Sequence, residues 1–548
     1  MKDSTYDTDS RRFLGVRQSA TAVVGSRYDH LLPLATLAIA ALILLLINPS
    51  ILGRAPEGDE LALLRNLKVI EWSGAFFPLP LFDLASPPGA TLSLKALAEI
   101  TQYNSTAMRL VLLLANCTFL YWATCATKIV NKEIPFVLFC MCLPLVYYTT
   151  ELKQYSFELI ASYIMIITIV TTRNLWKLRL ANVSALLLSF GAIIQVAAQT
   201  LIRAFGFLID WRRYGPHSVH QRIVDLAVTS VILLLFVLVG KYLTQLQLTN
   251  YNDESFKNNG LIIDFLRLGK LFFLAHGPLL SITGLFAAII AVRAFGFRAI
   301  AYHPLSVFFL ISVSAIVILR LAGLYPAVYP RHIIWLVPVS IFVISIWLDK
   351  IFVAWPSKSL RAALLFGMAV AAVVMSRTPM ERTSDYGLFD ALAKLPPASD
   401  VVLNLGAQVA LPLYEEKDSR LSRYEYHGWV NPKSAPTIPE EAAMENFAGN
   451  ASQPGAFSAW TYFVLNHDFR PLWSYLLNSA PVSQFYIATS FQTPIGSPVL
   501  DDSAKAMVES MRDRGCAFTS LYAGNLVEIL DVRCEPVTAP APRSSDLQ

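Results

Sequence analysis

Residues 31–60 read LLPLATLAIAALILLLINPSILGRAPEGDE, so a long apolar run leads directly into a polar, acidic segment. The apolar part, Leu31 to Ile47, is long enough to cross a bilayer as a helix. It lies far from the N-terminus and no A-x-A cleavage site follows it, so we interpret it as a retained helix and not as a signal peptide. The basic tail before it, residues 1–30, predicts a cytoplasmic N-terminus and puts the polar loop 49–106 on the outer side of the membrane.

Further apolar runs predict a polytopic α-helical membrane protein. Of the 548 residues, 55% are hydrophobic and only 15% are charged, which excludes an ordinary soluble protein. The net charge of +5 resides mainly in short loops between apolar runs, so it indicates topology and not nucleic-acid binding. Basic loops should lie on the cytoplasmic side of the membrane. All short basic loops fall on that side only if the run 180–210 forms two short helices, which gives about eleven spans within residues 31–376. Besides 31–47 and the divided 180–210, these spans are expected near 107–125, 134–150, 157–172, 224–244, 271–292, 300–320, 332–349 and 360–376.

The C-terminal region has a different pattern, because its apolar runs shorten to strand length and alternate with helix-like stretches. We expect a small α/β domain over residues 378–535 and a disordered Pro/Ala/Ser-rich tail over 536–548. The predicted topology places this domain outside, and in an oxidising compartment Cys516 and Cys534 could pair. Strands are expected at 401–405, 462–465 and 526–530, and helices at 386–395 and 501–512.

Asp59 and Glu60 open the first outer loop, and acids beside a membrane are costly unless they have a role there. One interpretation is a general base, because a well-placed carboxylate takes the proton of an attacking hydroxyl. The other is helix capping, since both acids precede an amphipathic run that contains Leu63, Leu64 and Leu67. The two are compatible, because a carboxylate fixed at a helix start is also well oriented.

The sequence YYTTELKQYS, residues 147–156, forms a short outer turn between two expected spans. Lys153 could hold a phosphate as a point charge, and Glu151 could bind a hydroxyl or orient the base. Gln154 and Tyr155 add polar groups that would orient a substrate. The alternative is an interfacial belt of tyrosines with a snorkelling lysine.

A third outer segment, YPAVYPRH at 325–332, precedes another span and contains Tyr325 as a further orienting group. Pro330 suits the first turn of a helix, which places Arg331 and His332 near its positive end as phosphate ligands. The alternative is an aromatic anchor with a flanking cation. All three segments fall on one predicted membrane face, which favours a shared site.

Metal ligation is not indicated by any spacing in the sequence, although outer-face acids could hold Mg²⁺ or Mn²⁺. His276 lies inside an expected span, where a histidine is more often a satisfied core residue than a ligand.

Five stretches support a resemblance to a known family: Gly58-Asp59-Glu60, Ser86-Pro87-Pro88, Met108-Arg109-Leu110, ELKQYS at 151–156, and Tyr325 to Arg331. In these the chain resembles bacterial GT-C glycosyltransferases, of the protein-mannosyltransferase-like group (family 39, aminoarabinose transferase-like). The resemblance spans the membrane part, and the ELKQYS string is its most specific element. It implies a GT-C fold, inverting transfer of a sugar from a polyprenyl phosphate, Asp59 as the catalytic carboxylate, and first-loop helices that lie on the membrane.

The resemblance also implies a bacterial inner-membrane protein with an extracytoplasmic C-terminal domain. Asp59 would deprotonate the acceptor, while Glu60 or Glu151 orients it. Lys153 with Arg331 would neutralise the departing phosphate. The loop holds one acidic pair where some relatives keep more acids, and the C-terminal domain shows no assignable motif, so the acceptor (glycan, lipid or protein) stays open. The alternatives are a transporter or flippase of lipid-linked sugars and a GT-C-like assembly protein without activity.

Overall fold

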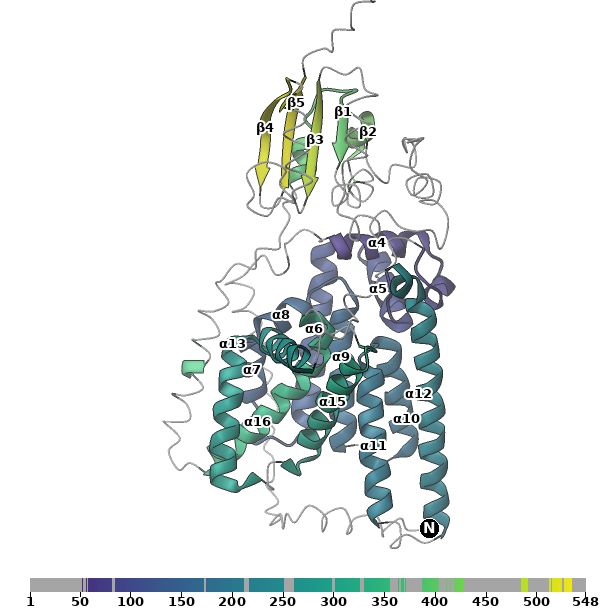
Figure 1. Cartoon of the computed structure of the whole chain (residues 1–548), viewed down its shortest axis with the longest axis vertical. Coiled ribbons are helices and arrows are strands. Elements are labelled where there is room, and N and C mark those ends of the chain that lie inside the picture. Colours follow the sequence, from purple (N-terminus) through teal and green to yellow (C-terminus); the bar gives the residue numbers. More distant parts are fainter. Residues whose placement is uncertain are drawn as a thin grey trace, which may run out of the picture.

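The chain folds in three layers: a helical bundle, short helices of the first loop at one end of that bundle, and a β-sheet beyond them (Figure 1). The structure is a computed structural model. It describes residues 52, 56, 58–80, 84–171, 174–210, 216–250, 261–297, 301–325, 330–354, 363, 366–368, 370, 387–403, 411, 414, 418–427, 484–490, 512, 513, 515–524 and 527–534.

The bundle is built from apolar helices, and among the described residues seven helices are long and apolar enough to cross a membrane. This agrees with the predicted polytopic helical architecture. The bundle helices are α6 (Ser105–Ala126), α7 (Ile134–Met141), α8 (Leu143–Thr149), α9 (Gln154–Thr171), α10 (Leu175–Leu188), α11 (Ala192–Asp210), α12 (Pro216–Asn250), α13 (Leu261–Phe295), α15 (Pro304–Leu321), the 3₁₀ helix η4 (Pro330–Leu336) and α16 (Val337–Ala354).

Two of the expected spans are interrupted. The division of 180–210 is confirmed, because α10 ends at Leu188 and α11 begins at Ala192. The helix expected at 134–150 is not continuous: it is divided between α7 and α8 at Cys142, whose ψ of 82° is not helical, just before Pro144. The expected spans at 31–47 and most of 360–376 lie outside the described residues.

Helices α12 and α13 are longer than the spans expected at 224–244 and 271–292. Each has 35 residues, so both extend into the segment that the sequence leaves between those two spans. A hydrocarbon core needs only about 20 residues, so the ends of the continuous helix α12 project beyond it. Helix α13 is also kinked at Gly277, whose φ of 73° suits glycine, and Pro278 follows with no N–H to continue the hydrogen-bond ladder.

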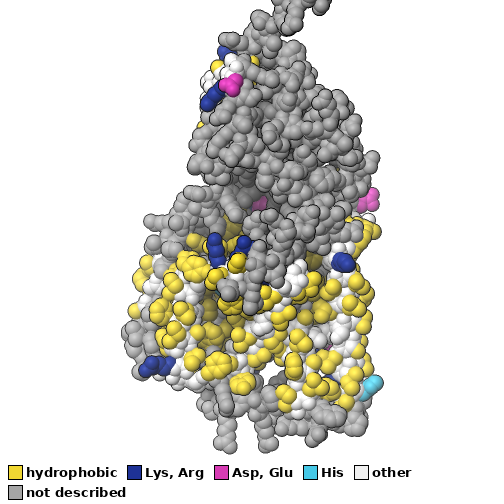
Figure 2. All heavy atoms as spheres, in the orientation of Figure 1, with side chains coloured by type: hydrophobic (Ala, Val, Ile, Leu, Met, Phe, Trp, Pro, Cys, Tyr) yellow, Lys and Arg dark blue, Asp and Glu magenta, His cyan; other side chains and the backbone are white. Residues whose placement is uncertain are grey.

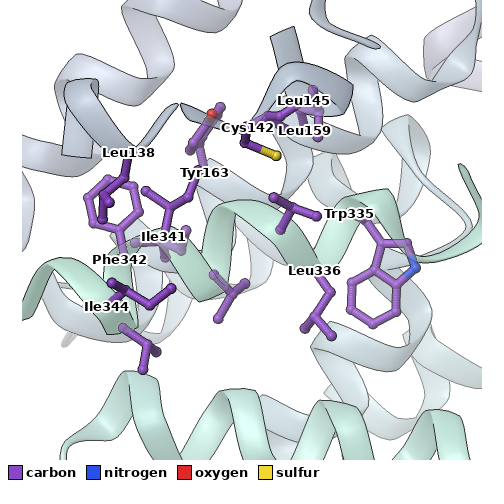
Figure 3. Close-up of a cluster of buried hydrophobic side chains, with 14 of the residues drawn as sticks. Leu138, Cys142, Leu145, Leu159, Tyr163, Trp335, Leu336, Ile341, Phe342 and Ile344 are labelled. Atoms are coloured by element: carbon purple, nitrogen blue, oxygen red, sulfur yellow. The ribbon is translucent and has the colours of Figure 1, made fainter. Parts of the chain in front are cut away.

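The bundle core is a large cluster of buried apolar side chains from α7, α8, α9, η4 and α16, including Tyr163 and Phe342 (Figure 3). Helix α16 is buried along most of its length, whereas α12 and α13 present many exposed apolar side chains such as Leu235 and Phe286. Figure 2 shows hydrophobic side chains over much of the visible face of the bundle. A surface of this kind fits contact with lipid chains.

His276 lies at the kink of α13 and has partners on both ring nitrogens. Nδ1 is 2.7 Å from the Phe272 carbonyl oxygen, and Nε2 is 2.7 Å from Ser340 Oγ on α16. Because a carbonyl only accepts, Nδ1 has the proton and Nε2 accepts from the serine hydroxyl. The expectation of a satisfied core histidine is therefore confirmed.

The first loop forms α4 (Gly58–Val69), the 3₁₀ helix η2 (Trp72–Phe76) and α5 (Pro88–Ile100). Lys95 of α5 donates through Nζ to the Leu67 carbonyl oxygen (2.9 Å), which ties α5 to the end of α4. Gly89 lets α5 approach α10 closely, because a Cβ at this position would lie 2.8 Å from the Leu187 carbonyl oxygen. These contacts hold the loop against the bundle.

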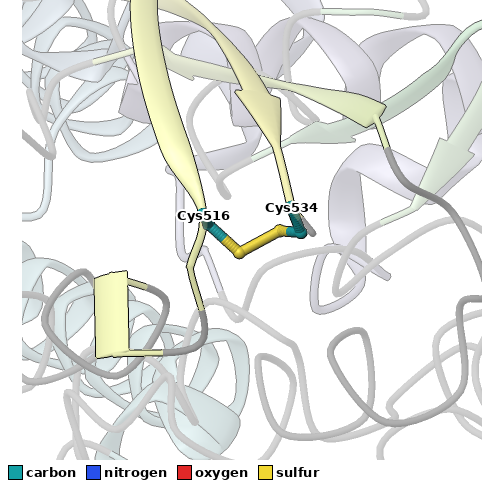
Figure 4. The surroundings of a disulfide bond; sticks show 2 residues. All are labelled: Cys516 and Cys534. Atoms are coloured by element: carbon teal, nitrogen blue, oxygen red, sulfur yellow. A yellow bond between two sulfur atoms is a disulfide. The ribbon is translucent and has the colours of Figure 1, made fainter. Parts of the chain in front are cut away.

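The C-terminal region forms a sheet with strand order β2-β1-β3-β5-β4. Strand β1 pairs in parallel with β2 and β3, and β5 pairs antiparallel with β3 and β4. Cys516 and Cys534, which the sequence left as a possible pair, form a disulfide that joins the start of β4 to the end of β5 (Figure 4). The other elements are α18 (Gly387–Leu392), β1 (Asp400–Leu403), the 3₁₀ helix η5 (Ser419–Arg423), β2 (Glu425–His427), β3 (Gln484–Ser490), β4 (Ala517–Gly524) and β5 (Val527–Arg533).

Strands expected at 401–405 and 526–530 correspond to β1 and β5, and α18 accounts for part of the helix expected at 386–395. The strand expected at 462–465, nearly all of the helix expected at 501–512, and the tail 536–548 lie outside the described residues.

Glu528 of β5 is only 7% exposed, and burial raises the pKa of its carboxyl, while a hydrogen bond with Ser520 lowers it. Because the folded pKa lies above the usual value of 4.5, ionised Glu528 destabilises the sheet at neutral pH. We expect Glu528→Gln to raise the unfolding temperature by about 2 °C at pH 7, as scanning calorimetry would measure. The gain should disappear at a pH low enough to protonate the Glu528 carboxyl in both the folded and the unfolded state. The control Asp513→Asn, at an exposed acid, should leave the unfolding temperature nearly unchanged.

Candidate functional site

Glu60 is the point where three separate parts of the chain meet. Its Oε2 accepts from Arg109 Nη2 of α6 at 2.6 Å, and its Oε1 accepts from the backbone N–H of Leu152 at 2.7 Å. Glu60 is 1% exposed and Arg109 is fully buried. A buried ion pair of this kind with a further hydrogen bond fixes its partners, because separating them would strand a charge. The start of α4 is thereby held against α6 and the segment before α9.

Asp59 immediately precedes Glu60 in the first turn of α4. The structure fixes its backbone there, while its side chain lies outside what is described. A carboxylate in the first helical turn is favoured by the positive end of the helix dipole. The junction at Glu60 therefore sets the position of the Asp59 backbone close to residues 151–153.

The second segment is compact and nearly buried. Glu151 is 8% and Lys153 is 4% exposed, and Lys153 Nζ lies 5.2 Å from the centre of the Tyr155 ring. The rings of Tyr155 and Tyr148 pack edge to face, with 5.4 Å between their centres. Aromatic faces, a cation and a carboxylate thus share one small volume at the start of α9.

Glu158, one turn after Gln154 on α9, was not expected in the site. It is buried and interacts electrostatically with both Glu151 and Lys153. An acid inside an apolar helix is a signal for function, because burial of a charge is expensive without a partner. That signal is visible in the sequence, within the run that follows ELKQYS.

Tyr325 and η4 bring the third segment to the same place. The Tyr325 hydroxyl donates to the His332 carbonyl oxygen, and Trp335 Nε1 lies 3.1 Å from both of those oxygens. Burial raises the pKa of the Tyr325 phenol, and charge interactions with Glu158 and Tyr155 act in the same direction. This segment therefore lies within electrostatic reach of the start of α9.

The backbone of η4 is held by hydrogen bonds from α9 and α11. Ser162 of α9 donates to the Trp335 carbonyl oxygen, and Gln195 Nε2 of α11 lies 3.2 Å from the same oxygen. Gly191 is needed here, because a Cβ would lie 2.4 Å from Trp335 Cδ1. The break between α10 and α11 thus makes room for the indole ring.

The structure therefore joins the first segment to the second by direct hydrogen bonding, while Tyr325 of the third segment interacts electrostatically with Glu158 and Tyr155 of the second. Arg331 and His332 belong to η4, which packs on α9. Within the part of the chain that is described, no three His, Cys, Asp or Glu side chains are grouped so that they could hold a metal ion.

Comparison with known proteins finds no matching protein-family model and no matching curated sequence. Two solved structures of ArnT from Cupriavidus metallidurans are similar in fold. The structure bound to undecaprenyl phosphate has a TM-score of 0.50 at 13% identity, over 92% of this chain and 98% of that chain. The apo structure has a TM-score of 0.49 at 12% identity, over 91% and 97%. At such low identity the similarity concerns the fold alone.

Proposed function

We propose that this protein is a membrane glycosyltransferase that moves a sugar from a polyprenyl-phosphate donor to an envelope acceptor. The reaction would take place at the bundle end covered by α4 and α5, which we assign to the outer face of the bacterial inner membrane. The observation that supports this most is the junction at Glu60, which holds an acidic helix start against the segment containing Lys153. The similarity in fold to ArnT, whose structure contains undecaprenyl phosphate, agrees with a lipid-phosphate donor.

In the proposed reaction, Asp59 accepts the proton of the acceptor hydroxyl as its oxygen attacks the anomeric carbon. The bond between that carbon and the phosphate oxygen breaks, so the configuration inverts and the polyprenyl phosphate leaves. Lys153 and Arg331, with His332, stabilise the charge on the departing phosphate. Glu151, Gln154, Tyr155 and Tyr325 orient the substrates, and we add Glu158 to this group.

In this proposal Glu60 positions the start of α4 and does not transfer a proton. Both of its carboxylate oxygens are engaged, one by Arg109 and one by the Leu152 N–H. A carboxylate held in this way is a poor proton acceptor, because protonation would break the buried ion pair. It is well suited to fixing the α4 start.

The experiment that tests the function uses the full-length protein in lipid nanodiscs with polyprenyl-phosphate sugars and candidate acceptors. Release of free polyprenyl phosphate together with a glycosylated acceptor supports the proposal. Movement of the lipid-linked sugar across the bilayer without release indicates a transporter. Neither release nor movement with any donor indicates an assembly protein.

Lys153 is the clearest test of donor recognition. We expect Lys153→Gln to weaken donor binding about tenfold or more, because a charge-assisted contact with phosphate is lost at a nearly buried position. Binding of a polyprenyl-phosphate sugar to the purified protein measures this directly. Lys177→Gln, at an exposed residue of α10, is the matched control. Equal donor affinity for Lys153→Gln and the wild type would remove Lys153 from the site.

A further inference from the structure

A cluster of charged residues lies at the opposite end of the bundle from α4 and α5. Helix α9 begins beside Glu60 and ends at Thr171, so α10 begins at the far end, α11 returns to it, and α12 leaves from it (Figure 1). Arg179 near the start of α10, Arg203 in the second half of α11 and Asp225 in the first half of α12 meet there.

Asp225 is fully buried between the two arginines. Its Oδ1 accepts from Arg179 Nε at 3.1 Å, and its Oδ2 accepts from Arg203 Nη2. The arginine side chains are 24% and 26% exposed, so each guanidinium is partly open at the protein surface.

One carboxylate neutralises only one of the two guanidinium groups. Each guanidinium has five N–H donors, and toward the described residues each uses only its bond to Asp225. Arg203 Nη1 is buried and, within the same residues, has no hydrogen-bond partner. The cluster therefore keeps one excess positive charge and several unused donors.

The neighbouring sequence adds further positive charge to that of the cluster. Residues 173–225 contain seven Lys and Arg residues but only two Asp, at 210 and 225. The cluster lies within about three turns of the ends of α10, α11 and α12, so long arginine side chains can reach the depth of lipid head groups from there. Anionic head groups attract basic residues at this depth.

We propose that Arg179 and Arg203 form a binding site for the phosphate of an anionic phospholipid in the leaflet opposite the α4 and α5 layer. Each guanidinium, held by the same carboxylate, has further N–H donors in a planar fork, an arrangement that matches phosphate oxygens well. The acyl chains would lie along the apolar surface of α12, where Val231, Leu234 and Leu238 are exposed. This site is separate from the proposed catalytic centre and does not depend on it.

Native mass spectrometry of the full-length protein tests the site, with phosphatidylglycerol, phosphatidylcholine or inorganic phosphate added. We expect selective retention of phosphatidylglycerol, reduced at least fivefold by Arg203→Gln and by Arg179→Gln. Arg293→Gln, at an exposed arginine near the end of α13, should retain it like the wild type. Equal retention by wild type and Arg203→Gln overturns the proposal, as does equal retention of phosphatidylcholine. Binding of inorganic phosphate without lipid selectivity would assign the site to a free anion and also overturn it.

Asp225→Asn separates lipid binding from a purely structural ion-pair role. Removing the carboxylate frees both guanidinium groups, so retention of phosphatidylglycerol should be equal to or greater than that of the wild type, and added phosphatidylglycerol should raise the unfolding temperature of this variant. A triad that serves only to hold three helices together predicts a lower unfolding temperature that the lipid does not restore. That second result would contradict the site.

Discussion

Asp59→Asn is expected to reduce sugar transfer about 10²–10⁴-fold, because it removes the proposed general base and leaves a group of nearly the same size. Donor affinity should change little, since the proposed phosphate contacts involve Lys153 and the start of η4. Single-turnover transfer with a polyprenyl-phosphate sugar measures the chemical step, and a separate binding measurement isolates the donor.

The control for this prediction is another acid of the same loop. Glu71 is exposed and makes no side-chain capping bond at the start of η2, so Glu71→Gln should transfer sugar at the wild-type rate. A normal unfolding temperature for Asp59→Asn would show that the fold is intact. Wild-type turnover by Asp59→Asn would end its assignment as the base.

Glu60→Gln should produce the largest loss of stability among the changes considered. It removes the carboxylate that pairs with the buried Arg109 guanidinium at 2.6 Å, and breaking a buried pair in this way costs about 3–5 kcal/mol. Both side chains are almost fully buried, so water cannot compensate the stranded charge. Thermal or denaturant unfolding of the purified protein in detergent measures this loss, and transfer should fall with it.

A double variant separates the two effects of Glu60→Gln, the loss of a buried ion pair and the loss of the contact that positions α4. In Glu60→Gln/Arg109→Met no charge remains, so much of the stability should return, while positioning of α4 stays impaired. The control is the exposed Glu99, whose ion pair with Lys95 lies partly in solvent, so Glu99→Gln should change the unfolding temperature little. If the double variant unfolds more easily than Glu60→Gln alone, the ion pair does not explain the effect.

Features with a local or periodic signature could be predicted from the sequence. The break between α10 and α11 followed from the alternation of basic loops. The position of Cys516 and Cys534 in the polar C-terminal region made their pairing possible but did not decide it. The division at Cys142 was missed, because an apolar run looks the same whether it forms one helix or two. The helical extensions of α12 and α13 were missed because hydropathy marks where the hydrocarbon ends and not where the helix ends.

The candidate site was predictable as a set of segments but not as a set of contacts. The first and second segments were expected on one face, and the Glu60 bond to the Leu152 N–H agrees with this. The pairing of Glu60 with Arg109 spans 49 residues, and no sequence pattern encodes a partner at that distance. Glu158 was not expected in the site because it lies inside the apolar run of α9, where hydropathy indicates a membrane span and no loop motif marks the position.

The disulfide between Cys516 and Cys534 has a consequence for how the protein matures. The four described cysteines of the bundle, at positions 117, 125, 140 and 142, are free thiols, so one chain contains both oxidised and reduced sulfur. A disulfide needs an oxidising compartment to persist. With the sheet on the outer face proposed above for the α4 and α5 layer, the β4–β5 hairpin would be locked only after translocation of that part of the polypeptide, so formation of the disulfide would be a late step of biogenesis.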